Sequence, residues 1–463
     1  MRRAALLVSL LAACGDDLGP DGDVLEQLKD LPGVTAVEWF PPADFGAEEG
    51  YRFFDVTFTQ PIDHDNPGGP TFQQYAAFMV RDPSAPLVFY TSGYGASWKR
   101  RLSEPADILD ANQLSLEYRF YERSRPSADW SKLTVKQASA DEHAILEAID
   151  PIFNGKTIQT GGSKGGENTM FHLWLYPDDL DGAVAYVPPV ITEWLDPRYA
   201  TNLDDIGANL PACRDALRAV QREMLIRRTA MESFASETAD FTIAGVAHAT
   251  ETAIVELEFS FWMTRGEHDC PLVPPTTATD EELFTFLNET GGPYAYGDQD
   301  LYLYGNQYIF QDHNELGYPV WQHAHLDDLL QFSYEDWSAY LPTEKPAYDP
   351  TMPRGLAAWL ATSPPHLMIV GGEWDPWGPG YPAVTADADT RVYSVPHASH
   401  WTASIFALPP AEKDEALATL AQWGGVTTHR SRRPQFPMGF TPSRRLIETT
   451  PITQTPLRNV VGE

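Results

Sequence analysis

A serine, an aspartate and a histidine follow one another along this chain, each in a setting that suits catalysis. Ser163 is the centre of the run GGSKG, Asp375 follows the run VGGEW, and His400 ends the run HASH. A serine hydroxyl is a poor nucleophile until a base removes its proton, and a histidine oriented by a carboxylate supplies that base. The glycine-rich motif alone is weak evidence, but the ordered set of three predicts attack by Ser163 on a carbonyl carbon.

The residues beside Ser163 predict a sharp turn between a strand and a helix. Residues 156–160 have the composition of a strand, and residues 165–176 have that of a helix. Glycine permits strained dihedrals and close packing, so such a turn would expose the serine hydroxyl. It would also point the amide of Lys164 into an oxyanion hole at the positive end of the helix.

A second oxyanion donor should come from a loop that follows an early strand. The run TSGYG at 91–95 follows the apolar run 87–90, and we expect the amide of Gly93 or Tyr94 to serve. An ordinary glycine turn is the alternative for this loop.

Two histidines compete for the role of the base. We expect His400, because it lies deeper in the loop that follows the strand-like run 391–395, and His397 is the alternative. Asp375 is the expected orienting acid, with Glu373 as the second candidate. An aspartate in this position fixes the imidazole tautomer and stabilises its charged form.

Two other clusters contain residue types that bind metals. The first comprises His323, His325, Asp327 and Asp328, and the second is the run EHDC at 267–270. Neither has the spacing of a zinc-binding motif. We therefore expect no metal and no organic cofactor.

Strand-like and helix-like segments alternate on both sides of a long insertion. Strands are predicted at 51–60, 72–80, 87–90, 114–118, 156–160, 183–187, 366–370 and 391–395, and a helix at 137–149. This alternation is typical of a mostly parallel sheet. Together with the order Ser, Asp, His it predicts an α/β-hydrolase fold.

The insertion is mostly helical. Helices are predicted at 208–232, 250–263, 280–287 and 326–340. The predicted organisation is a core in two parts, 51–190 and 356–425, with a cap at 191–355 over the active site, an N-terminal segment at 14–50 and a tail at 426–463. A separate helical domain without a catalytic role is the alternative for the insertion.

Composition excludes some partners. The chain has 463 residues, 43% of them apolar, and a formal net charge of −33. A nucleic-acid-binding protein needs a basic surface, and anionic membranes repel an acidic one. We therefore expect no nucleic-acid partner and no direct membrane-binding surface.

The first residues predict export. A basic start, MRR, precedes the apolar run 4–11, which is too short to span a membrane, and LAAC at 11–14 resembles a bacterial lipobox. We expect a signal peptide at 1–13, lipidation of Cys14, and a lipoprotein of the cell envelope or a secreted protein. Cys213 and Cys270 could then form a disulfide in an oxidising compartment, or remain buried free thiols.

Several runs together resemble a known family. They are FTQPIDH at 58–64, GYG at 93–95, EYRFYERSRP at 117–126, GGSKGG at 161–166 and DPW at 375–377. These runs are similar to those of the secreted bacterial tripeptidyl aminopeptidases of the prolyl tri/tetrapeptidyl type, and more distantly to lysosomal prolyl carboxypeptidases. Two departures are the base loop, which reads PHASH in place of a glycine-rich turn, and Tyr118, which stands where histidine is common.

The resemblance implies a serine exopeptidase that cleaves short peptides from the N-terminus of peptide substrates, often after proline, without a cofactor. Such an enzyme needs an anion for the free amine of the substrate, and the candidates are Glu104, Glu117, Glu122 and Glu193. Two alternatives stay open: an esterase or lipase on the same fold, and a lipoprotein that keeps the fold only for binding.

Overall fold

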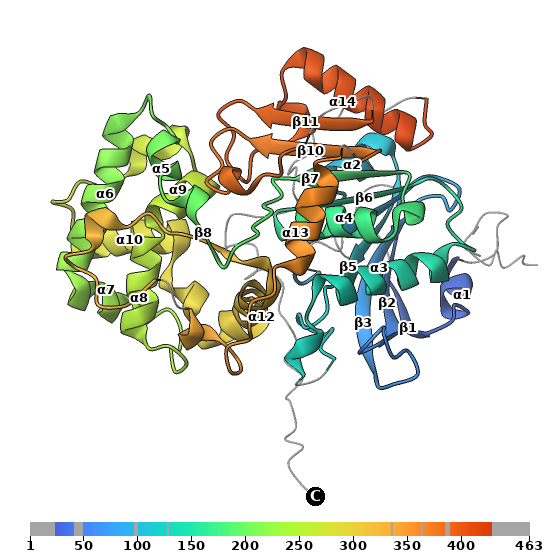
Figure 1. Cartoon of the computed structure of the whole chain (residues 1–463), viewed down its shortest axis with the longest axis horizontal. Coiled ribbons are helices and arrows are strands. Elements are labelled where there is room, and N and C mark those ends of the chain that lie inside the picture. The colour runs from blue at the N-terminus through green and yellow to red at the C-terminus, as the bar shows by residue number, and fades with distance from the viewer. Residues whose placement is uncertain are drawn as a thin grey trace, which may run out of the picture.

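The computed structural model describes residues 24–40, 50–96, 101–126, 129–334, 337–362, 364–384 and 389–427. The expected signal peptide, Cys14 and almost all of the predicted tail lie outside these residues. The described chain forms an α/β core with a helical cap beside it (Figure 1).

A nine-stranded sheet forms the core. Its order is β1 (Val34–Phe40), β2 (Arg52–Pro61), β3 (Thr71–Val80), β5 (Asn112–Leu116), β4 (Leu87–Thr91), β6 (Thr157–Gly162), β7 (Gly182–Tyr186), β10 (Leu367–Gly372) and β11 (Thr390–Val395). Neighbours from β1 to β5 pair antiparallel, and those from β5 to β11 pair parallel. Strands β4, β5, β7 and β10 are buried along their whole length, as expected for parallel strands covered on both faces.

Helices cover both faces of the sheet. On one face lie α1 (Val24–Lys29), α3 (Val135–Ile149), α4 (Lys164–Leu175) and α13 (Thr351–Leu360), which share one apolar cluster with the strands. On the other face lie α2 (Glu104–Leu109) and α14 (Pro410–Trp423), in a second cluster. Because α13 packs against α4, the core resumes at Thr351, slightly before the predicted boundary.

The cap has its own apolar core, which includes Leu217, Phe261 and Trp262. Its helices are α5 (Asn202–Asp205), α6 (Pro211–Ile226), α7 (Arg228–Ala235), α8 (Val246–Val255), α9 (Leu257–Thr264), α10 (Asp280–Gly291), α11 (Asp298–Asp300) and α12 (Asn306–Gln311). Two π-helical segments, η7 (Leu301–Gly305) and η8 (Asp312–Leu316), flank α12. Cys213 of α6 forms a disulfide with Cys270 of η5 (Glu267–Leu272).

A separate two-stranded sheet pairs the start of the cap with a segment near its end. Strand β8 (Leu195–Asp196) pairs in parallel with β9 (Tyr318–Pro319). In the described part of the chain, no helix combines the length and apolar character that crossing a membrane requires.

Two sequence-based expectations differ from the structure. The N-terminal segment 14–50 contains strand β1, which pairs with β2 and so belongs to the sheet. The helix predicted at 326–340 is wrong, because the described residues of this range (326–334 and 337–340) form no α-helix. Short 3₁₀ turns lie near its ends, η9 (Ala324–Leu326) and η10 (Ser338–Tyr340). The buried carboxylate of Glu251 accepts hydrogen bonds from the amides of Gln331 and Phe332, so these backbone donors are satisfied outside a helix.

One buried carboxylate connects α2 to the segment that follows the predicted base loop. Glu104 accepts hydrogen bonds from the Tyr186 hydroxyl (2.6 Å) and from the amides of Ile405 (2.9 Å) and Phe406 (3.1 Å). Burial outweighs these bonds and raises the pKa of Glu104 to about 7. The folded protein therefore holds this proton more tightly than the unfolded chain does.

The pKa of Glu104 predicts a pH-dependent stability. Because its folded pKa lies above its unfolded value, the contribution is complete below the unfolded pKa and is lost as the pH rises through about 7. Between about pH 5 and pH 8 we expect wild type to lose roughly 1–3 kcal/mol more than Glu104→Gln, measured by thermal unfolding. Glu412→Gln, at an exposed position of α14, is the control. Equal losses in wild type and Glu104→Gln would contradict the prediction.

Candidate active site

Ser163 occupies the sharp turn between β6 and α4. Its φ of 56° and ψ of −127° are strained for a residue with a side chain. The Ser163 amide donates to the carbonyl of Tyr186 on β7 (2.9 Å), and its own carbonyl accepts from the amide of Glu167 (2.9 Å). The turn is thus fixed on both sides, and the hydroxyl lies at the carboxyl end of the parallel strands.

The glycines near Ser163 are explained by one close backbone approach. A Cβ atom on Gly161 would lie 2.2 Å from the carbonyl oxygen of Thr91, and one on Gly165 would lie 2.1 Å from the same oxygen. Both contacts are too short for any side chain. Strand β4 can therefore pack against the turn only if both positions are glycine.

Asp375 and His400 meet at the same end of the sheet. They follow the neighbouring parallel strands β10 and β11, and His400 Nδ1 lies 2.6 Å from Asp375 Oδ2. Both are buried, with 2% and 4% of their surface exposed. The hydroxyl of Tyr381 also donates to Oδ2, and the amide of Trp377 donates to Oδ1 (2.9 Å). These bonds fix the carboxylate, which holds the ring with Nδ1 as donor and Nε2 turned away.

The alternative base and acid lie together at the surface. The side chain of His397 is 51% exposed and stacks on Trp374, with ring centroids 4.3 Å apart. Its Nδ1 lies 3.3 Å from Glu267 Oε1, and its amide donates to Glu373 Oε2 (2.8 Å). The structure therefore brings Asp375 to His400 and leaves His397 and Glu373 outside that pair.

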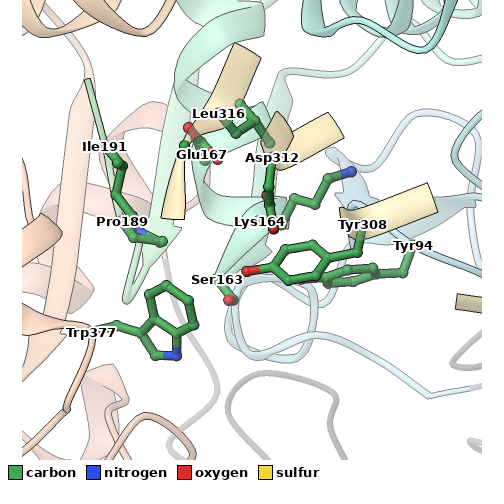
Figure 2. A pocket seen from close by; sticks show the side chains of 11 residues that line it. Tyr94, Ser163, Lys164, Glu167, Pro189, Ile191, Tyr308, Asp312, Leu316 and Trp377 are labelled. Atoms are coloured by element: carbon green, nitrogen blue, oxygen red, sulfur yellow. The ribbon is translucent and has the colours of Figure 1, made fainter. Parts of the chain in front are cut away.

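Ser163 lines a cavity of about 350 Å³, counted with the solvent at its mouth, between the core and the cap (Figure 2). The other lining residues are Tyr94, Lys164, Glu167, Pro189, Ile191, Tyr308, Asp312, Leu316, Gly317 and Trp377. The ring of Trp377 lies 6.4 Å from that of His400, so the cavity extends from the serine toward the histidine loop.

The loop at 91–95 lies against the N-terminus of α4. Gly93 has a φ of 75°, and a Cβ atom there would lie 3.0 Å from the amide nitrogen of Gly165. The amide of Tyr94 already donates to Ser92 Oγ (3.0 Å), whereas the amide of Gly93 makes only a long contact with Thr91 Oγ1 (3.4 Å). Of the two predicted donors, Gly93 therefore has the amide that is less committed to the protein.

The sequence predicts a role for the amide of Lys164 but none for its side chain. It is buried, its Nζ donates to the carbonyl of Gly93 (2.6 Å), and Nζ lies 3.6 Å from the ring centroid of Tyr118. Burial lowers the pKa of Lys164 to about 7, and nearby carboxylates oppose this shift. Tyr118, the departure from the family pattern, thus provides an aromatic face for the ammonium group.

None of the four acidic residues predicted to bind a substrate amine lines the cavity. Glu104 has the structural bonds described above, and Glu117 accepts from Ser124 Oγ (2.7 Å) and the amide of Arg123 (2.9 Å). Glu122 accepts from the Tyr304 hydroxyl (2.7 Å), and Glu193 is exposed outside the cavity.

Two other carboxylates do line the cavity, those of Glu167 and Asp312. The signal for Glu167 was present in the sequence, since a residue four positions after Ser163 lies one helical turn away on the same side. Asp312 comes from the cap, and no local pattern places it near the serine.

Comparison with known proteins identifies a family and a relative that match most of the chain. The chain matches the family described as PS-10 peptidase S37 over residues 20–438. It is 34% identical over 433 residues to the prolyl tri/tetrapeptidyl aminopeptidase of Streptomyces mobaraensis, covering 90% of this chain and 88% of that protein.

Solved structures with similar folds include a proline iminopeptidase of Mycobacterium smegmatis, with a TM-score of 0.40, 15% identity and coverage of 80% of this chain and 98% of that one. Another is an α/β hydrolase of Novosphingobium aromaticivorans, with a TM-score of 0.36, 15% identity and coverage of 82% and 99%.

The predicted fold class is confirmed: a mostly parallel sheet is covered by helices on both faces, and the serine occupies a strand-to-helix turn, as in an α/β hydrolase. The match to the family extends over nearly the whole chain, through core and cap alike. The chain belongs to the S37 family of serine peptidases.

Proposed function

We propose that the protein is an exported aminopeptidase that releases short peptides from the N-terminus of its substrates, with a preference for cleavage after proline. The observation that carries the proposal is the buried His400–Asp375 pair at the same end of the sheet as the strained turn of Ser163. The relative from Streptomyces mobaraensis, named a prolyl tri/tetrapeptidyl aminopeptidase, supports the choice of substrate.

In the proposed mechanism, the hydroxyl of Ser163 attacks the carbonyl carbon of the scissile peptide bond. Nε2 of His400 accepts the serine proton and then gives it to the departing amine, while Asp375 stabilises the charged imidazole. The amides of Lys164 and Gly93 stabilise the oxyanion. A water molecule then attacks the acyl-enzyme, with His400 again as the base, and releases the peptide.

The cavity walls support a preference for proline and for chain ends. Tyr94, Tyr308, Pro189 and Trp377 provide aromatic and ring-shaped surfaces around Ser163. Flat apolar walls of this kind suit a compact pyrrolidine ring. The cap supplies part of the lining, and we expect it to limit access to the flexible ends of peptide chains.

The rival functions make different demands on the cavity. An esterase or lipase acting on lipids would need an apolar passage, whereas buried carboxylates line this one. A lipoprotein that only binds peptides would not need the strained conformation of Ser163, which costs about 1–3 kcal/mol.

We expect a fluorophosphonate probe to label the wild-type protein on Ser163, because the His400–Asp375 pair activates the hydroxyl. Ser163→Ala should not be labelled, as shown by intact-protein mass spectrometry. The wild-type protein should also hydrolyse a tripeptide p-nitroanilide that ends in proline. Turnover of esters alone would favour the esterase, and absence of labelling would favour the binding lipoprotein.

The two histidines should differ sharply in their effect on catalysis. We expect His400→Ala to lower kcat by at least about 10³-fold, and the matched change His397→Ala to alter it by less than about threefold. Steady-state kinetics with the same p-nitroanilide checks both values. A large loss in His397→Ala with little loss in His400→Ala would reverse the assignment.

We also propose export and lipid anchoring through Cys14, on the evidence of the basic start, the apolar run 4–11 and LAAC at 11–14. Expressed in a bacterium with a lipoprotein pathway, the mature protein should begin at Cys14 and carry the mass of attached acyl chains. Cys14→Ser should lose that mass and leave the membrane fraction. An unmodified N-terminus in the wild-type protein would refute the anchor.

A further inference from the structure

We infer that Glu167 and Asp312 together bind the α-ammonium group of the peptide substrate. This inference deepens the proposed aminopeptidase function and rests on it. It identifies the recognition element that distinguishes a free N-terminus from an internal peptide segment, and it assigns that element to one residue of the core and one of the cap.

The two carboxylates reach the cavity of Ser163 from different parts of the fold. Glu167 belongs to α4, one turn after the serine, and Asp312 begins the π-helical segment η8 of the cap (Figure 2). They line the same cavity as Ser163 and are 4% and 2% exposed. π-Helical segments inside helices are rare and occur frequently at functional sites.

In the part of the chain that the structure describes, no hydrogen bond reaches either carboxylate of this pair. Oδ2 of Asp312 is buried there without a donor. Within the described residues, the carboxylate of Glu167 also accepts no hydrogen bond. Buried carboxylates are ordinarily paired or fully hydrogen-bonded, because desolvation of a charge is costly. Unsatisfied oxygens that face a cavity therefore point to a ligand that donates hydrogen bonds.

The nearby protein cation makes no close ion pair with either carboxylate. Lys164 lines the cavity, and its Nζ donates to the carbonyl of Gly93. In the described structure it forms no ion pair within 4 Å with Glu167 or Asp312, although its charge opposes the rise in the pKa of both groups. A further buried carboxylate, that of Glu315, lies close enough to affect Glu167 and Lys164, and it has its own donors in Gln311 and the amide of Val135. The cluster thus contains more carboxyl groups than cationic groups.

The pKa shifts of both carboxyl groups agree with a site that binds a cation. Burial raises the pKa of Glu167 to about 8, and it also raises the pKa of Asp312, which the charge of Glu167 raises further. A substrate ammonium group would provide the positive charge and three donors that this pair lacks. A metal ion is a poorer fit, because no group of three or more metal-binding side chains exists among the described residues.

Matched substrates test the inference. We would compare Ala-Ala-Pro-p-nitroanilide with its N-acetylated form, and use p-nitrophenyl acetate to report on the serine chemistry without any amine. The variants are Glu167→Gln and Asp312→Asn, which keep the shape and remove the charge. Glu193→Gln, at an exposed position outside the cavity, is the control.

For the free peptide, we expect kcat/KM to fall by about 10²-fold in each variant, because the ammonium group loses a buried charged partner. The acetylated peptide and the ester should change by less than about threefold in either variant. The ratio of kcat/KM for the free peptide to kcat/KM for the acetylated peptide should therefore be much smaller in each variant than in the wild type. Equal losses for free and acetylated peptides, or no loss for either, would overturn the inference.

A binding experiment with Ser163→Ala tests the inference even if the variants at Glu167 and Asp312 fail to fold. This protein keeps both carboxylates, and calorimetry should show that Ala-Ala-Pro binds at least about tenfold more tightly than acetyl-Ala-Ala-Pro. Equal affinities would overturn the amine site even if peptidase activity is present. If wild type cleaves neither peptide nor ester, the proposed function fails, and the calorimetric comparison still decides the amine site. Tighter binding of an acetylated peptide that carries lysine would assign the carboxylates to a side chain and also overturn the inference.

Discussion

The carbonyl oxygen of Thr91 sets the spacing on which the catalytic end of this fold depends. It lies so close to the turn after β6 that positions 161 and 165 have no room for a Cβ atom. With these two glycines, strand β4 lies against the start of α4, and its continuation, the loop at 91–95, lies next to Ser163. The nucleophile, the helix terminus and Gly93 are therefore placed by one backbone contact, and larger residues at 161 or 165 would separate all three.

Buried ionisable side chains gather beside the serine at the junction of core and cap. Lys164, Glu167 and Asp312 line the cavity there, and burial shifts the pKa of each toward its neutral form. Burial of such a cluster costs free energy, because each charge loses its hydration and interactions with neighbouring groups offset only part of that loss. Its position beside the serine indicates that charge at this junction serves ligand binding rather than stability.

The parts of the fold that depend on local patterns could be predicted from the sequence. The buried parallel strands appear as compact apolar runs, and the turn at Ser163 appears as a dense group of glycines, so the fold and the order of the three catalytic candidates could be read from the chain. The parts that depend on contacts between residues far apart in the sequence could not be predicted. Asp312 joins the cavity only through the packing of the cap, and the region 326–340 loses its predicted helix because a distant carboxylate, Glu251, takes its backbone donors.

The positive φ of Ser163 has a consequence for the stability of the protein. Only glycine adopts such a conformation without strain, so glycine at this position would make the protein more stable. If the chain were selected for folding alone, we would therefore expect glycine in place of Ser163. The serine at this position therefore lowers the thermodynamic stability of the fold, and what it provides in return is a single hydroxyl oxygen.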